Sequence, residues 1–150
     1  MNPKKVNLFQ YNTISGTVVD FGSGLNNTNI ILDYHNSINF YNDPEQCQEF
    51  VNPVGIIQST GDVAAKICSD LNLNGFDDWY LPSIGELELV YTNLFSQGFG
   101  DFSGSTASNL ASSSDDYSND YRLFTIDLTS GSVVNDYKYN LVYYRAVRSF

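Results

Sequence analysis

Residues 75–94, GFDDWYLPSIGELELVYTNL, contain the local signals that decide the fold. Ser83 precedes Glu86 by three residues, which is the spacing of a capping box, where each side chain accepts a hydrogen bond from the other residue's backbone N–H. Pro82 disfavours helical backbone at Leu81, so we expect a helix that begins just after Ser83. The apolar residues that recur at helical spacing, and that predict its buried face, are Leu87, Val90, Tyr91 and Leu94.

The same stretch resembles a known signature. Residues 78–94 are similar to the pattern DWYLPS-x-x-EL-x-x-x-Y-x-NL in the C-terminal domain of the Legionella collagen-like adhesin family. That family belongs to the C-type-lectin-like folds, together with formylglycine-generating enzyme and the phage major tropism determinant. Residues 112–114 (SSS) stand where the family has WSSS or WSST, and residues 145–148 (RAVR) resemble its terminal VRAVR-x-F. The resemblance extends from about residue 59 to Phe150.

The resemblance assigns a structural motif to residues at both ends of this region. Its members are Asp78, Trp79, Leu81, Pro82, Ser83, Glu86, Arg145 and Arg148. Trp79 is the single tryptophan, and the motif implies that it packs in the core and does not stack on a sugar. Arg145 and Arg148 point to opposite faces of a regular strand, so we expect each to pair with a local carboxylate, with Asp78 and Glu86 as candidates.

The family pattern is not followed everywhere. Leu110 and Ala111 replace the Tyr-Trp pair that precedes the family's serines, and Leu128 replaces the Phe of an FxxG turn that ends at Gly131. Local packing around these positions is therefore expected to differ from that of the family.

Two helices with strands on both sides form an α+β pattern. The resemblance implies a C-type-lectin-like fold, with two helices packed on a twisted antiparallel sheet and the N- and C-terminal strands paired. In this chain the terminal pairing would place Val18 or Val19 near Val147. We expect an N-terminal arm over residues 1–14 and a single domain over residues 15–150.

The remaining elements follow from apolar runs and turn residues. Strands are predicted at residues 15–21, 29–34, 37–41, 54–58, 121–128, 132–135 and 141–148. A first helix is predicted from a cap at Ser59 or Thr60 to about Leu71. Its packing face comprises Ala64, Ala65, Ile67, Cys68 and Leu71.

Composition argues against several classes of partner. The 150 residues carry a formal net charge of −10 with seven Lys and Arg in total, which argues against nucleic acid, anionic membrane and heparin-like ligands. No apolar run is long enough to span a membrane. The basic pair near the N-terminus is not followed by an apolar segment, so we expect no secretory signal in this chain.

The residues that carry most enzyme chemistry are scarce. His35 is the single histidine and is expected in an exposed turn. Cys47 and Cys68 allow one disulfide, but two buried thiols are favoured because Cys68 falls on the inner face of a predicted helix. The formylglycine-generating branch of the resembled group uses closely placed redox cysteines and a metal, a pattern that these two do not match. We therefore expect no enzymatic activity.

Calcium is the cation that the acidic segments would suit. The oxygen-bearing side chains are Asp115, Asp116, Asn119, Asp120, Asp127 and Asp136. The chain has no EPN, QPD or WND sequence of the calcium-dependent lectins and no EF-hand loop. We therefore expect no cofactor and interpret these residues as a solvated acidic surface, with a calcium site as the alternative.

Two polar segments have the composition of recognition loops. Residues 115–121 read DDYSNDY and residues 135–140 read NDYKYN. Tyr gives large contact area at low entropic cost, and Asn and Ser give adaptable hydrogen bonds. An ordinary polar loop is the alternative, but the phage determinants of the resembled fold bind through their C-terminal region. The predicted ligand-binding residues are Asp115, Asp116, Tyr117, Asn119, Tyr121, Asp136, Tyr137 and Tyr139.

These observations predict a non-enzymatic binding or adhesion module on a virion, fibre or cell surface. We expect a glycan or protein receptor, no nucleic acid, no membrane insertion, and a homo-oligomer such as a trimer or a larger assembly. The resembled family includes an adhesin for sulfated glycans, but the acidic charge favours a neutral glycan or a protein surface here. A structural decoration or cement component of a phage particle is the first alternative, and a formylglycine-generating type of enzyme is the second.

Overall fold

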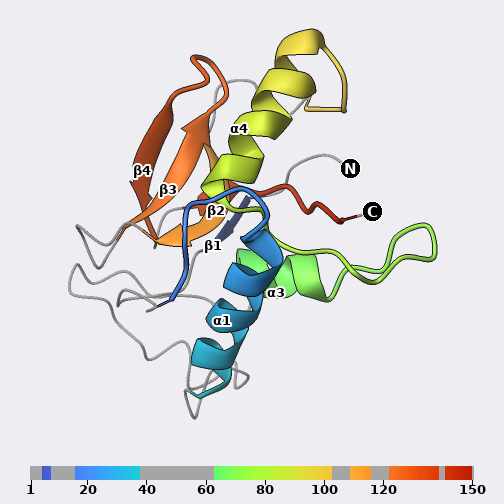
Figure 1. The fold of residues 1–150 in the computed structure, drawn as a ribbon, viewed down its shortest axis with the longest axis vertical. Helices are drawn as coiled ribbons and strands as arrows, with labels where there is room; N and C mark the ends of the chain where they lie inside the picture. Colours follow the sequence, from blue (N-terminus) through green and yellow to red (C-terminus); the bar gives the residue numbers. More distant parts are fainter. Residues whose placement is uncertain are drawn as a thin grey trace.

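A computed structural model describes residues 5–7, 16–37, 63–102, 109–115, 122–138 and 141–149. The fold is α+β, with one five-stranded sheet in the order β1-β5-β2-β3-β4. The strands are β1 (Lys5–Asn7), β2 (Asn109–Asp115), β3 (Arg122–Asp127), β4 (Val133–Tyr137) and β5 (Leu141–Tyr143). The helices are α1 (Gly24–Asn36), α3 (Ala64–Ser69), α4 (Ile84–Asn93) and the short 3-10 helix η1 (Phe95–Gln97). Figure 1 shows α4 beside the β2–β4 part of the sheet, with α1 and α3 packed together at one end.

Helix α4 begins with the predicted capping box. The Ser83 N–H donates to Glu86 Oε2 at 2.8 Å, and the Glu86 N–H donates to Ser83 Oγ at 3.3 Å. Leu87 is fully buried, and Val90 and Tyr91 pack against the core as expected. The prediction is wrong for Leu94, which is 39% exposed because the chain leaves α4 there and turns into η1.

Residues 29–34 are helical and not a strand as predicted. The buried residues of α1 recur at helical spacing, and they are Gly24, Asn27, Thr28, Ile31 and His35. Asn27, Thr28 and His35 are polar, so this face carries no apolar stripe that would have indicated a helix. Residues 16–21, predicted as a strand, form no strand; the Asn27 side chain donates to the Val18 carbonyl and accepts from its N–H.

The other predicted strands are confirmed only in part. Ser37 caps the end of α1, so it does not start a strand. The rest of the predicted strand at residues 37–41, and the whole of the one at residues 54–58, lie outside the described residues. The predicted strands at residues 121–128 and 132–135 correspond to β3 and β4, which form an antiparallel hairpin.

The first and last strands pair, as expected for a chain whose ends close the sheet. The pairing joins Lys5–Asn7 of the predicted arm to β5 in antiparallel register, and Val18 and Val19 take no part in it. Val147 instead forms a backbone bridge with Tyr80 through two hydrogen bonds of 2.9 and 3.0 Å. The sheet is also not wholly antiparallel, because β2 pairs with β5 in parallel.

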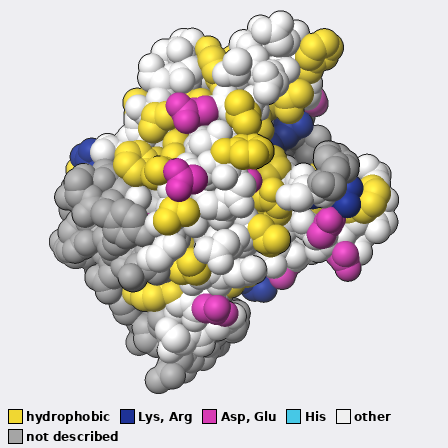
Figure 2. All heavy atoms as spheres, viewed as in Figure 1, with side chains coloured by type: hydrophobic (Ala, Val, Ile, Leu, Met, Phe, Trp, Pro, Cys, Tyr) yellow, Lys and Arg dark blue, Asp and Glu magenta, His cyan; other side chains and the backbone are white. Residues whose placement is uncertain are grey.

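The surface mixes apolar and polar side chains. On the face shown in Figure 2, acidic side chains lie singly among hydrophobic and uncharged polar ones, and Lys and Arg form no dense cluster. Several large apolar side chains remain exposed near α4, among them Phe21 at 72% and Leu89 at 44%.

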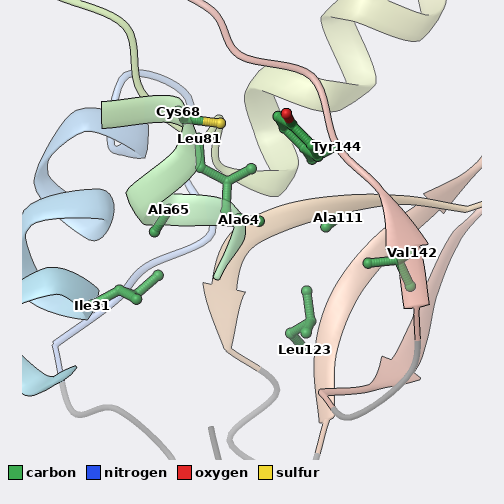
Figure 3. Packing of buried hydrophobic residues seen from close by; sticks show 9 residues of the cluster. All are labelled: Ile31, Ala64, Ala65, Cys68, Leu81, Ala111, Leu123, Val142 and Tyr144. Atoms are coloured by element: carbon green, nitrogen blue, oxygen red, sulfur yellow. The ribbon is translucent and has the colours of Figure 1, made fainter. Parts of the chain in front are cut away.

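Two apolar clusters form the core. One lies between α4, η1 and the sheet and contains Ile84, Leu87, Phe102, Leu110, Ile126 and Leu128. The other lies where α1 and α3 meet the sheet, and its side chains converge from both helices and three strands (Figure 3). Its α3 members are Ala64, Ala65 and Cys68, which confirms the predicted packing face for these residues. Cys68 is a free thiol whose burial raises its pKa, whereas Cys47 lies outside the described residues.

The β3–β4 turn approaches α4 closely at Gly131. Gly131 has φ 74°, a backbone conformation that L side chains rarely adopt, and a Cβ there would collide with the Tyr91 ring. Gly98 has a similar φ of 72°, but a Cβ added there would meet nothing within 4 Å. The two glycines therefore differ in contact and not in backbone conformation.

We predict that Gly131→Ala destabilises the protein more than Gly98→Ala. Both substitutions place alanine in left-handed backbone, at a cost of about 1–2 kcal/mol. Only Gly131→Ala also forces the Tyr91 ring to move, which adds about 1–3 kcal/mol. Urea unfolding of the two variants measures the difference, and equal losses of stability would contradict the packing of Tyr91 over this turn.

Candidate binding surface

The two predicted recognition segments leave the same end of the sheet. Asp115 at the end of β2 pairs with Leu123 near the start of β3, and Arg122 pairs with Tyr137 at the end of β4. Because both pairings are antiparallel, the connections over residues 116–121 and 139–140 start from the same end of the sheet. We call this region, made of Asp115, Leu123, Arg122, Tyr137 and Lys138, the loop end of the sheet.

A buried ion pair joins the bases of the two connections. Lys138 Nζ lies 3.0 Å from Asp115 Oδ2, and the two side chains are 1% and 3% exposed. The Asp115 N–H also donates to Thr17 Oγ1 at 3.3 Å. The pair therefore ties the end of β4 to the end of β2 inside the protein, and it places the Asp115 carboxylate away from the exposed surface that the sequence predicted.

Arg122 and Tyr137 form a second contact at the loop end. Arg122 Nη2 donates to the Tyr137 hydroxyl at 2.9 Å, and Nη1 donates to Asn135 Oδ1 at 2.6 Å. The guanidinium carbon lies 4.3 Å from the centre of the Tyr137 ring. Tyr137 is partly buried, so one part of the ring packs on Arg122 while the rest remains accessible.

Three of the predicted ligand-binding residues are described, and the structure brings them together at the loop end. Asp115 is buried, whereas Asp136 and Tyr137 are partly exposed neighbours on β4. The others, Asp116, Tyr117, Asn119, Tyr121 and Tyr139, lie outside the described residues. The accessible part of the described surface is therefore contributed by β4.

Of the residues considered for calcium, Asp116, Asn119 and Asp120 lie outside the described residues, and Asp127 is engaged elsewhere. Asp127 stabilises the β3–β4 turn, where its carboxylate accepts from the Thr129 N–H and the Ser130 hydroxyl, each at 2.8 Å. These hydrogen bonds lower the pKa of Asp127. Within the described ranges, no three His, Cys, Asp or Glu side chains gather as a metal site.

The structural motif is held by Arg148 and Asp78. Arg148 donates to both oxygens of the Asp78 carboxylate, at 2.8 and 3.0 Å, and its guanidinium carbon lies 3.7 Å from the centre of the Phe76 ring. This bidentate contact lowers the pKa of Asp78, chiefly through the hydrogen bond itself. The expected pairing of Arg148 with a local carboxylate is confirmed.

Trp79 differs from expectation, and Arg145 lies near a carboxylate other than the two candidates. Arg145 donates to the Asp101 carbonyl oxygen at 2.8 Å, packs on the Phe102 ring and is attracted by the Asp101 charge. Burial lowers its pKa. Trp79 is only partly buried, because its indole N–H reaches the Phe76 carbonyl at 3.0 Å in the neighbouring turn.

Two further features of the structure were not predicted from the sequence. His35 is 1% exposed and lies within α1, where Nδ1 is 2.8 Å from the Ile31 carbonyl oxygen, so the prediction of an exposed turn is wrong. A groove of about 570 Å³ also runs beside α4, lined by residues that include Phe21, Tyr80, Leu94 and Arg148. Its apolar lining comes from three separate segments, so no single stretch of sequence indicates it.

Comparison of the chain with protein families, with curated proteins and with solved structures gives no match. Among the described residues, no helix is both long and apolar enough to cross a membrane. Function is therefore inferred from this chain's own residues.

We predict that breaking the buried ion pair is far more costly than breaking an exposed one. Lys138→Met leaves the Asp115 carboxylate buried without its cation, at a cost of about 3–5 kcal/mol. Lys66→Met is the matched control, since Lys66 and Asp70 form an exposed pair at 2.6 Å whose loss costs less than about 1 kcal/mol. Urea denaturation of both variants measures the contrast, and similar losses would show that Lys138 is not buried with Asp115.

We predict that Arg148→Gln raises the pKa of Asp78. The folded-state pKa of Asp78 is below its ordinary value of about 4. The ion pair therefore stabilises the protein fully at pH values above that ordinary pKa, and this stabilisation is lost as the pH falls through the folded-state pKa. NMR titration of side-chain carboxyl carbons measures the change. Asp127 is the internal control, because its lowered pKa depends on Thr129 and Ser130 and stays lowered. An unchanged Asp78 pKa would exclude Arg148 as its partner.

Proposed function

We propose that this chain is a non-enzymatic binding or adhesion module that recognises its ligand through the loop end of the sheet. The observation that carries the proposal is the position of the two segments rich in Tyr and Asn. Both start from the same end of the sheet, and the buried ion pair between Asp115 and Lys138 joins their bases. A shared, fixed base supports the proposal that one ligand contacts both segments.

We further propose a C-type-lectin-like architecture. The proposal is supported by the capped helix α4 after Pro82, by the pairing of β1 with β5, and by the bridge between Tyr80 and Val147. The contact between Arg148 and Asp78 adds a side-chain link between the same two segments. Helix α1 and the parallel pairing of β2 with β5 are the departures from the expected pattern.

The proposed ligand is a neutral glycan or a protein surface. A net charge of −10 repels sulfated glycans and other polyanions at long range. Arg122, a cation at the proposed surface, already donates to Asn135 and Tyr137. Aromatic and amide side chains remain as the contact groups, and these suit sugar rings and backbone amides. We propose display on a virion, fibre or cell surface as a homo-oligomer, for which a trimer is one form.

A second candidate function, a decoration or cement component of a particle, is supported by the groove beside α4. Phe21, Leu89 and Leu94 line it and are 72%, 44% and 39% exposed. Apolar side chains gathered in one groove are typical of a contact between proteins. In this alternative the groove contacts a neighbouring subunit, and the loop end has no separate receptor.

We predict that Tyr117→Ala weakens ligand binding about tenfold or more, because loss of an aromatic contact at the centre of an interface has that effect. The measurement is a glycan array with the purified chain, followed by titration of any hit, with mass in solution determined by light scattering. Phe21→Ser in the groove is the matched control and leaves ligand binding unchanged. If Phe21→Ser instead abolishes self-association, and the chain binds no glycan or host surface protein, the particle component replaces the binding module.

A further inference from the structure

A small cavity lies where α1 and α3 meet the sheet. Its volume is about 20 Å³, and its lining is partly apolar and partly polar. The apolar residues are Ile31, Val63, Ala64, Ala65, Leu81 and Leu123, most of which are labelled in Figure 3. A cavity needs roughly 10–15 Å³ to hold one water molecule, so this one has room for a water and none for a substrate.

Ser113 brings an unsatisfied hydroxyl to this cavity. Its side chain is 1% exposed, and its Oγ has no hydrogen-bond partner among the described residues. The adjacent serines differ: Ser112 Oγ donates to the Phe124 carbonyl at 2.6 Å, and Ser114 Oγ donates to the Val18 carbonyl at 2.9 Å. A buried hydroxyl without a partner is destabilising, so the Ser113 hydroxyl calls for a hydrogen-bonding group inside the cavity.

The lining supplies a second polar group on the same cavity. Asp115 lines it, and a carboxylate that receives Lys138 through one oxygen keeps capacity for further donors. His35 also lines the cavity; its Nδ1 carries a hydrogen toward the Ile31 carbonyl, because a carbonyl oxygen can only accept. A buried water requires two to four polar partners, and the Ser113 hydroxyl and the Asp115 carboxylate supply two.

We propose that this cavity is a binding site for one structural water molecule. The Ser113 hydroxyl donates to the water, and the water donates to a second acceptor in the lining, for which the Asp115 carboxylate is the charged choice. The bound water fills the space between β2 and the helices α1 and α3, next to the ion pair at the loop end. The proposal does not depend on which ligand the loop end binds.

The test is a crystal structure of the unsubstituted chain together with the thermal stability of Ser113→Ala. We expect an isolated density peak within hydrogen-bonding distance of Ser113 Oγ, and a lower Tm for Ser113→Ala, because the water loses a partner. Ser132→Ala, at an exposed position in the β3–β4 turn, is the matched control and leaves Tm unchanged.

A dry cavity gives the opposite sign. Removing a hydroxyl that has no partner relieves a buried polar group, so Ser113→Ala would then raise Tm. No density in the cavity, at a resolution that shows other buried waters, would overturn the proposal. If Ser113→Ala does not fold, the density in the unsubstituted chain decides alone.

Discussion

The fold depends on the hydrogen bonds at the start of α4. Ser83 is fully buried and Glu86 is 7% exposed, so water does not replace the bonds they make. Besides closing the capping box, Ser83 Oγ donates to the Asp20 carbonyl at 2.8 Å, and Glu86 Oε1 accepts from the Tyr80 hydroxyl at 3.3 Å. One helix cap therefore also fixes the loop before α1 and the strand-like segment before α4.

Strand β2 is attached to the same point. The Ser113 N–H donates to the Pro82 carbonyl at 2.8 Å, and the Ile84 N–H donates to Ser114 Oγ at 3.0 Å. The loop before α1 also packs against the first turn of α4. It lies so close that a Cβ at Gly85 would be 2.9 Å from the Val19 carbonyl oxygen. The LPS and SSS sequences thus contact each other directly, which gives a physical reason for both to occur in one chain.

The features that the sequence predicted depend on interactions between residues close in the chain, and those it missed depend on residues far apart in the chain. Helix α4 was predictable because capping and periodicity are local, and the pairing of Arg148 with a local carboxylate followed from the signature. Helix α1 was not, because Thr28 is buried by partners far along the chain: its Oγ1 both donates to and accepts from the Leu81 backbone. The burial of Asp115 depends likewise on Lys138, which lies 23 positions away. The sequence therefore indicated the composition of the candidate loops, but it did not predict the buried ion pair at the base of the candidate site.

The interior beneath the loop end contains several buried polar side chains, and these bear on how the proposed binding surface is supported. Apolar packing tolerates small shifts, but a hydrogen bond or ion pair such as that of Asp115 with Lys138 is satisfied in few geometries. Tyr137, held by Arg122, extends the same constraint toward the surface. A contact group positioned before the ligand arrives loses less conformational entropy on binding. The buried polar contacts therefore give the proposed binding surface a base that keeps its shape.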